Sequence, residues 1–210
     1  MLNKIFSGQY LQRLDNTIQW QEKDTLTKDS VSSHSFKVTV FARILLEDVF
    51  GNINSEKVID FKLEVVTAAL FHDFDEALLM RDISHELKYN DYNGDKIRAV
   101  LNDYVKHRAT SEFLENVNNN NANYKASARM VVDAVTNNNV TVKLFVKYCD
   151  WLALLFYCKR EIGLNNNQFE DIYDYCEENV LKTGQKLRES LIEYFPYTKM
   201  ELNCIETEKE

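Results

Sequence analysis

Asp150 is a charged residue in the middle of an apolar segment, and this feature constrains the fold more than any other. Residues 144–156 around it are almost all aliphatic or aromatic, apart from Lys147. Such a segment predicts a buried helix, and burying a carboxylate without a partner is costly. Asp150 therefore needs either a Lys or Arg partner or a bound cation.

Two other apolar segments carry the same anomaly. His34 begins the apolar run of residues 36–46, and His72 and Asp73 directly follow the apolar residues 65–71. Three helical segments that each bring a His or an Asp into core-like sequence predict one buried cation with ligands from all three. We therefore expect a metalloprotein, and an enzyme.

The composition predicts an all-α fold with a single domain. The 210 residues are 45% hydrophobic, which is enough for one substantial core, and only five glycines and one proline interrupt the chain. We expect the domain to cover residues 1–200 and the acidic tail 201–210 to fray. Apolar periodicity predicts helices at 4–20, 33–50, 55–80, 94–115, 122–136, 140–162 and 168–194.

Local signals predict where some of these helices begin and what separates them. Ser32 or Ser33 is the expected N-cap of the second helix, and Asn54 or Ser55 that of the third. The Asn-rich stretches 116–123, 137–139 and 165–167 are expected to be loops, because asparagine favours turns over helix interiors.

Charge and cysteine usage exclude several classes of protein. A formal charge of −8 argues against a broad electrostatic grip on DNA or RNA. No stretch approaches the roughly 20 apolar residues of a membrane span. The four cysteines form no CxxC pair, so we expect them to be reduced core residues in a cytoplasmic protein.

The candidate ligands define the chemistry of the predicted site. His34, His72, Asp73 and Asp150 combine nitrogen and oxygen donors, a set that suits Mn²⁺, Fe²⁺, Co²⁺ or Zn²⁺, whereas Mg²⁺ is less well matched. Four protein ligands on an ion that takes up to six leave room for water and substrate. Because such an ion activates water and polarises a phosphoryl oxygen, the set favours phosphate ester hydrolysis.

These residues match a known pattern. His34, then His72-Asp73, then Asp150 resemble the ordered ligand set of the HD-domain metal-dependent phosphohydrolases. The similarity is greatest to the YfbR-like bacterial 5'-deoxynucleotidases, over about residues 20–158. It rests on four segments of the sequence: residues 31–35, 71–76, 82 with 87–89, and 146–150.

The resemblance implies an HD-type helical bundle, usually a homodimer, that removes phosphate from deoxyribonucleoside 5'-monophosphates with a divalent cation. It implies that Glu76 assists the attacking water. It also implies that Asp82 holds the sugar and the water network, if one residue more than in the family pattern is accepted between Glu76 and Asp82. It also implies that Trp20 lines the sugar pocket and favours deoxyribose.

One position departs from the family. The family has an Arg that contacts phosphate just before the Trp, and this chain has Gln19 there, so a dianionic phosphate is less neutralised. Arg13, Lys28 or Lys88 are candidates for the missing charge. The departure leaves open a deoxynucleoside triphosphate hydrolase or a non-catalytic nucleotide sensor on the same scaffold, and a helical bundle with a purely structural metal ranks last.

Overall fold

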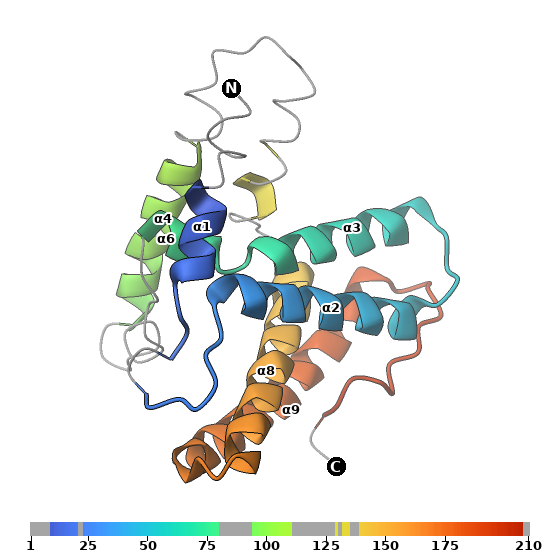
Figure 1. Cartoon of the computed structure of the whole chain (residues 1–210). Coiled ribbons are helices and arrows are strands. Elements are labelled where there is room, and N and C mark those ends of the chain that lie inside the picture. The colour runs from blue at the N-terminus through green and yellow to red at the C-terminus, as the bar shows by residue number, and fades with distance from the viewer. Residues whose placement is uncertain are drawn as a thin grey trace. The chain divides into compact units, whose positions relative to one another are not determined.

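The structure is a computed structural model that describes residues 9–20, 23–79, 94–110, 129, 132–134 and 139–207. Within these ranges the regular elements are helices, which confirms the predicted all-α fold (Figure 1). Their bounds are α1 (Gln9–Asn16), α2 (Val31–Phe50), α3 (Glu56–Phe71), α4 (Phe74–Leu79), α6 (Gly94–Thr110), α8 (Val140–Gly163), the 3₁₀ turn η2 (Asn167–Phe169) and α9 (Glu170–Tyr194). The Asn-rich residues 116–123 and 137–138 lie outside the described ranges.

The chain divides into two compact units. The first takes the described parts of Met1–Asp24, Lys28–Ser35 and Phe71–Asn137, and in it α4 contacts both α1 and α6. The second takes the described parts of Thr25–Thr27, Phe36–Leu70 and Asn138–Glu210, and α8 and α9 lie side by side in it (Figure 1). A single HD domain over residues 1–200 stays a prediction.

The helix predicted over 55–80 is interrupted. α3 ends at Phe71, His72 and Asp73 form a turn, and α4 begins at Phe74. Periodicity does not reveal this break, because the apolar spacing continues through it. The turn matters for the site, since neighbouring residues on a continuous helix point in directions about 100° apart.

Ser30, rather than Ser32 or Ser33, caps α2. Its Oγ accepts a hydrogen bond from the backbone N–H of Ser33 at 3.2 Å and lies 2.9 Å from Oγ of Ser32. The predicted cap was two or three residues too late, because three serines stand close together and each is a good cap. For α3 the predicted Ser55 is confirmed, since its Oγ accepts a hydrogen bond from N–H of Val58 at 3.4 Å.

Aromatic side chains form the core of the second unit. Phe61 of α3 lies at its centre, with ring centroids 5.8 Å from Phe50, 5.2 Å from Phe195 and 6.1 Å from Phe145. These edge-on contacts are the favoured geometry for aromatic pairs. They join α2, α3, α8 and the end of α9 into one packed layer, which holds α8 in place.

The first turn of α8 is fixed by a cap and by α9. Oδ1 of Asn139 accepts hydrogen bonds from N–H of Thr141 and Val142, at 3.1 and 3.4 Å. The hydroxyls of Thr141 and Ser190 lie 2.8 Å apart. After α8 the chain turns at Asn165, whose φ of 66° suits asparagine better than most residues.

Residues 205 and 206 of the acidic tail are packed against the rest of the second unit. Ile205 is only 2% exposed, and N–H of Glu206 donates to the hydroxyl of Tyr148 at 2.9 Å. Burial raises the pKa of Tyr148 to about 12, so this hydroxyl stays protonated. The prediction of fraying relied on charge and overlooked Ile205, which packs the tail.

Candidate metal centre

His34 occupies the first turn of α2 and is almost completely buried. Its backbone N–H donates to the carbonyl of Ser30 at 2.9 Å, so the cap residue fixes where the His lies on the helix. The side chain is 2% exposed. A buried imidazole at this place is held by the start of the helix instead of by a flexible loop.

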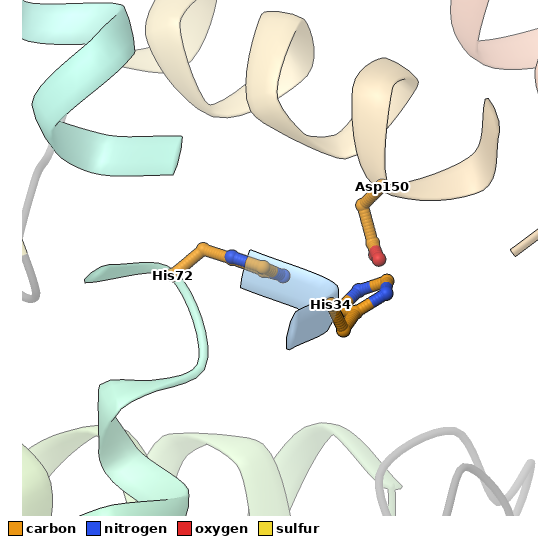
Figure 2. A group of neighbouring side chains, drawn as sticks. All are labelled: His34, His72 and Asp150. Atoms are coloured by element: carbon orange, nitrogen blue, oxygen red, sulfur yellow. The ribbon is translucent and has the colours of Figure 1, made fainter. Parts of the chain in front are cut away.

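His72 and Asp73 lie in the turn between α3 and α4, and both face His34. Nε2 of His72 is 3.1 Å from Oδ2 of Asp73, and Nε2 of His34 is 3.9 Å from the same oxygen. The two imidazole centroids are 5.3 Å apart, and Figure 2 shows the ring of His72 pointing toward His34. The turn therefore lets adjacent residues converge, as the ligand prediction requires.

Glu76 lies one turn further along the same unit, in the first turn of α4. Its backbone N–H donates to the carbonyl of Asp73 at 3.1 Å, and Glu76 is only 3% exposed. A carboxylate buried to this degree is unusual for a helix start on a protein surface. Glu76 is therefore a buried carboxylate and not a solvated surface residue.

Asp150 lies on α8 in the second unit and is 8% exposed. Oδ2 of Asp150 accepts a hydrogen bond from Nζ of Lys147 at 2.8 Å. Lys147 is therefore a Lys partner of the kind that the sequence predicted as one possibility for Asp150. Burial, together with the charge of Asp150, raises the pKa of the Cys149 thiol, so this cysteine is a protonated core residue. All four cysteines are free.

Gln19 and Trp20 lie on a segment that pairs with the start of α2. N–H of Gln19 donates to the carbonyl of Asp29, and N–H of Val31 donates to the carbonyl of Thr17, both at 2.9 Å. Trp20 has a φ of 62°, a left-handed conformation that costs a bulky residue about 1–2 kcal/mol. Strain of this kind persists where the surroundings impose it, and it often marks a functional position.

The remaining predicted residues divide into two groups. Asp82 and Lys88 lie outside the described residues. Arg13 on α1 is half-buried, and Lys28 is exposed just before α2. A phosphate-binding role of Arg13 or Lys28 stays a prediction.

Sequence reasoning missed Glu161, a buried carboxylate at the end of α8. It is 0% exposed, and it accepts hydrogen bonds from N–H of Leu26 at 2.8 Å, N–H of Thr27 at 2.7 Å and the side chain of Asn166 at 2.8 Å. The neighbouring Lys159 and Arg160 make this region resemble a solvated helix end. The available signal was helical register, since Glu161 lies three and four residues after the buried Cys158 and Tyr157.

The donors of the first unit suit a divalent metal ion. Two imidazole nitrogens, from His34 and His72, face one carboxylate oxygen of Asp73. This mixture of nitrogen and oxygen donors without a thiolate fits borderline divalent ions and does not resemble a closed structural zinc site rich in cysteine.

Comparison with solved structures supports an HD-type fold. The chain is similar to the crystal structure of an HD-domain phosphohydrolase from Listeria innocua, with a TM-score of 0.62 and 22% sequence identity over 90% of this chain and 84% of the other. No curated protein matched the sequence significantly. The architecture is therefore that of the HD-domain proteins.

The sequence also matches the profile of the YfbR-like 5'-deoxynucleotidases over residues 7–200. The chain belongs to this family. It is accordingly a hydrolase of the metal-dependent phosphohydrolase class. Among the described helices, none has the length and apolar character needed to span a membrane.

Proposed function

We propose that the protein removes the 5'-phosphate from deoxyribonucleoside 5'-monophosphates. Family membership over residues 7–200 gives the reaction class, and the convergence of His34, His72 and Asp73 is the observation that carries the proposal. The proposed substrate is a small nucleotide. We place the reaction in the cytoplasm, in keeping with four free cysteines.

In this proposal His34, His72, Asp73 and Asp150 hold one divalent ion, with Mn²⁺, Co²⁺, Fe²⁺ and Zn²⁺ preferred over Mg²⁺. Support comes from the order of these residues in the sequence and from their donor types. Further support is that the imidazoles of His34 and His72 lie with centroids 5.3 Å apart in the first unit, and that Asp150 is a buried carboxylate on α8 of the second. Asp73 adds a carboxylate beside both imidazoles.

When bound, the ion supplies Lewis-acid activation of water and of the phosphoryl oxygen. Glu76 would accept the proton of the attacking water on its carboxylate. In support, its backbone N–H donates to the Asp73 carbonyl and its side chain is buried in the same unit. Asp82 is proposed to hold the sugar and the water network.

Trp20 is proposed to form the wall against which the deoxyribose packs. The support is its strained φ of 62° within a segment that pairs with the start of α2. His34 lies there, four residues after the cap residue Ser30. Gln19 and Lys88 are proposed to contact the nucleotide near its phosphate. Gln19 does so as a neutral amide, which leaves charge neutralisation to other groups.

We also propose that the protein is a homodimer that uses α3. Beside its buried face, this helix carries a second apolar stripe at positions i, i+4, i+7 and i+11, formed by Ile59, Leu63, Val66 and Leu70, of which Leu63 is 56% exposed. Exposed apolar residues that line up on one face often mark a protein–protein contact. Phe36, Val40 and Ile44 of α2 are exposed apolar residues as well.

Because Gln19 stands where the family has an Arg, there are two alternatives to the proposed activity: a deoxynucleoside triphosphate hydrolase and a non-catalytic nucleotide sensor. Product analysis separates them. Metal-stripped protein resupplied with Mn²⁺ or Co²⁺ is offered deoxyribonucleoside mono- and triphosphates, and the products are resolved by ion exchange. The proposal expects phosphate from monophosphates; triphosphate released from triphosphates, or nucleotide binding without any product, would support the respective alternative.

A further inference from the structure

Lys147 holds its charge in a defined place next to Asp150. Nζ of Lys147 is 2.8 Å from Oδ2 of Asp150 and 4.2 Å from the ring centre of Trp151. These partners stand three and four residues further along α8, so they occupy the same helix face as Lys147. The contacts separate this Lys from an ordinary surface Lys, whose side chain samples many conformations.

The support beneath the ammonium group is rigid. Trp151 is 5% exposed, and its ring packs edge-on against Tyr175 of α9 with centroids 5.7 Å apart. Lys147 itself keeps 35% of its side chain accessible, against 11% for Asp150. The ammonium group is therefore anchored by Asp150 and Trp151, and about a third of the Lys147 side chain is accessible to solvent.

A phosphate monoester dianion is bound more strongly when a cationic side chain lies beside the metal ion, and Lys88, the cation already proposed near it, lies outside the described residues. The ion's charge is largely balanced by the carboxylates proposed to hold it, and Gln19 contributes a neutral amide. Lys28 is exposed, whereas Lys147 is in direct contact with one of the proposed ligands. Charge-assisted hydrogen bonds to phosphate are about twice as strong as neutral ones, so an anchored ammonium at this position has a large effect.

We infer that Lys147 is a substrate-binding residue that donates to a phosphate oxygen and supplies the charge that Gln19 does not. The inference rests on the proposed function, since it assumes that the ion and the phosphate meet at Asp150. Without ion or substrate, Lys147 balances the Asp150 carboxylate. With an ion bound at Asp150, the ammonium group of Lys147 would be available to donate to the phosphate.

This role predicts opposite effects on two ligands. Removing the ammonium deletes a donor to phosphate, so phosphate binding weakens. It also removes a cation that competes with the metal for Asp150, so metal binding is unchanged or tighter. A purely structural role predicts the reverse for the metal, because an unsupported Asp150 would bind the ion less well.

The test compares Lys147→Met with Lys143→Met. Met retains the apolar stem over Trp151 without the charge. Lys143 lies one turn earlier on α8, is exposed, and gives the same change in net charge. Lys147→Arg restores the charge. Each variant is titrated with Co²⁺ and then, as the Co²⁺-loaded protein, with inorganic phosphate, using calorimetry, and its thermal unfolding is recorded beside the wild type.

We expect Lys147→Met to bind phosphate about tenfold more weakly or worse, the scale of a hydrogen bond to a charged group. Its Co²⁺ affinity should be equal to or higher than that of the wild type. Lys147→Arg should recover most of the phosphate affinity, and Lys143→Met should match the wild type for both ligands.

Two results would overturn the inference while leaving the proposed function intact. One is phosphate binding by Lys147→Met that equals the wild type, and the other is a parallel loss of Co²⁺ affinity. A wild-type protein that binds Co²⁺ but no phosphate would instead count against the proposed function itself. Because binding of inorganic phosphate needs no turnover, these failures are distinguishable.

Discussion

Glu161 accepts hydrogen bonds from both the backbone N–H and the hydroxyl of Thr27, a residue 134 positions earlier in the chain. Tyr157, one turn before Glu161, donates its hydroxyl to the carbonyl of the same Thr27 at 2.6 Å. The end of α8 thus holds the short segment that connects the Trp20 turn to the start of α2.

Burial alone would raise the pKa of Glu161, but the hydrogen bonds from Thr27, Leu26 and Asn166 outweigh it and lower the pKa from 4.5 to about 2. A carboxylate whose pKa is lowered in the folded state stabilises the protein above its unfolded pKa. We therefore expect about 3 kcal/mol of stability to be lost as the pH falls from about 4.5 to 2.

Urea unfolding at several pH values tests this expectation. In Glu161→Gln the stability at neutral pH should fall, and its further decrease below pH 4.5 should be smaller than in the wild type by the Glu161 contribution. Glu193→Gln, an exposed change of the same kind on α9, should retain the wild-type profile. An identical acid limb in the wild type and Glu161→Gln would contradict the assignment.

Gly184 on α9 is required by the packed tail. A Cβ at this position would lie 1.9 Å from the carbonyl oxygen of Glu206 and 3.1 Å from the ring of Tyr148. We expect Gly184→Ala to destabilise the protein by about 1–3 kcal/mol, the usual cost of overpacking. At Gly163 nothing lies within 4 Å of the added Cβ, so Gly163→Ala should be neutral or slightly stabilising in the same urea titration. Equal effects of the two changes would show that the tail is not packed against α9.

The left-handed backbone of Trp20 predicts an inverted ranking of small substitutions. Because φ is 62°, Trp20→Gly should be more stable than Trp20→Ala by about 1 kcal/mol, opposite to the usual preference for alanine. If Trp20 walls the sugar pocket, both variants should also lose about tenfold of the preference for deoxyribo- over ribonucleotides, measured as the ratio of kcat/KM values. Trp20→Phe should retain most of it. An unchanged ratio in Trp20→Gly would remove Trp20 from the pocket.

The second apolar stripe of α3 predicts the outcome of a charge placed within it. Leu63→Glu should convert a homodimer into a monomer, because a buried carboxylate without a partner opposes association. Light scattering coupled to size exclusion measures the mass. Leu164→Glu changes a similarly exposed leucine after α8, 47% against 56% exposed, and should stay dimeric. A wild-type monomer, or a dimer in Leu63→Glu, would exclude this face.

Helical periodicity was sufficient to predict the all-α fold and the positions of α2, α8 and α9 to within a few residues. The same signal failed at His72 and Asp73, where the apolar spacing runs on but the chain turns. Periodicity reports which side chains are buried, and it carries little information about a short interruption between two helices. The convergence of His34, His72 and Asp73 was nevertheless expected from residue type alone.

What the sequence could not reveal depends on contacts between distant segments. Glu161 was hidden because its partners, Leu26 and Thr27, are more than a hundred residues away. Ile205 was overlooked because a single apolar residue in an acidic tail gives no periodic pattern. Lys147 was not singled out, because the sequence predicted only an unspecified Lys or Arg, or a cation, as the partner of Asp150, and sequence spacing does not fix the direction of a long side chain.

The most direct measurement determines metal content and phosphate release on the same samples of wild type, Asp73→Ala and Glu76→Gln, with deoxyribonucleoside 5'-monophosphates and resupplied Mn²⁺ or Co²⁺. We expect the wild type to bind metal and to release phosphate only when it is loaded. Asp73→Ala should lose both properties, whereas Glu76→Gln should keep the metal and lose at least a hundredfold in kcat, the usual contribution of a general base. Full turnover in Asp73→Ala, or in Glu76→Gln, would contradict the proposed site.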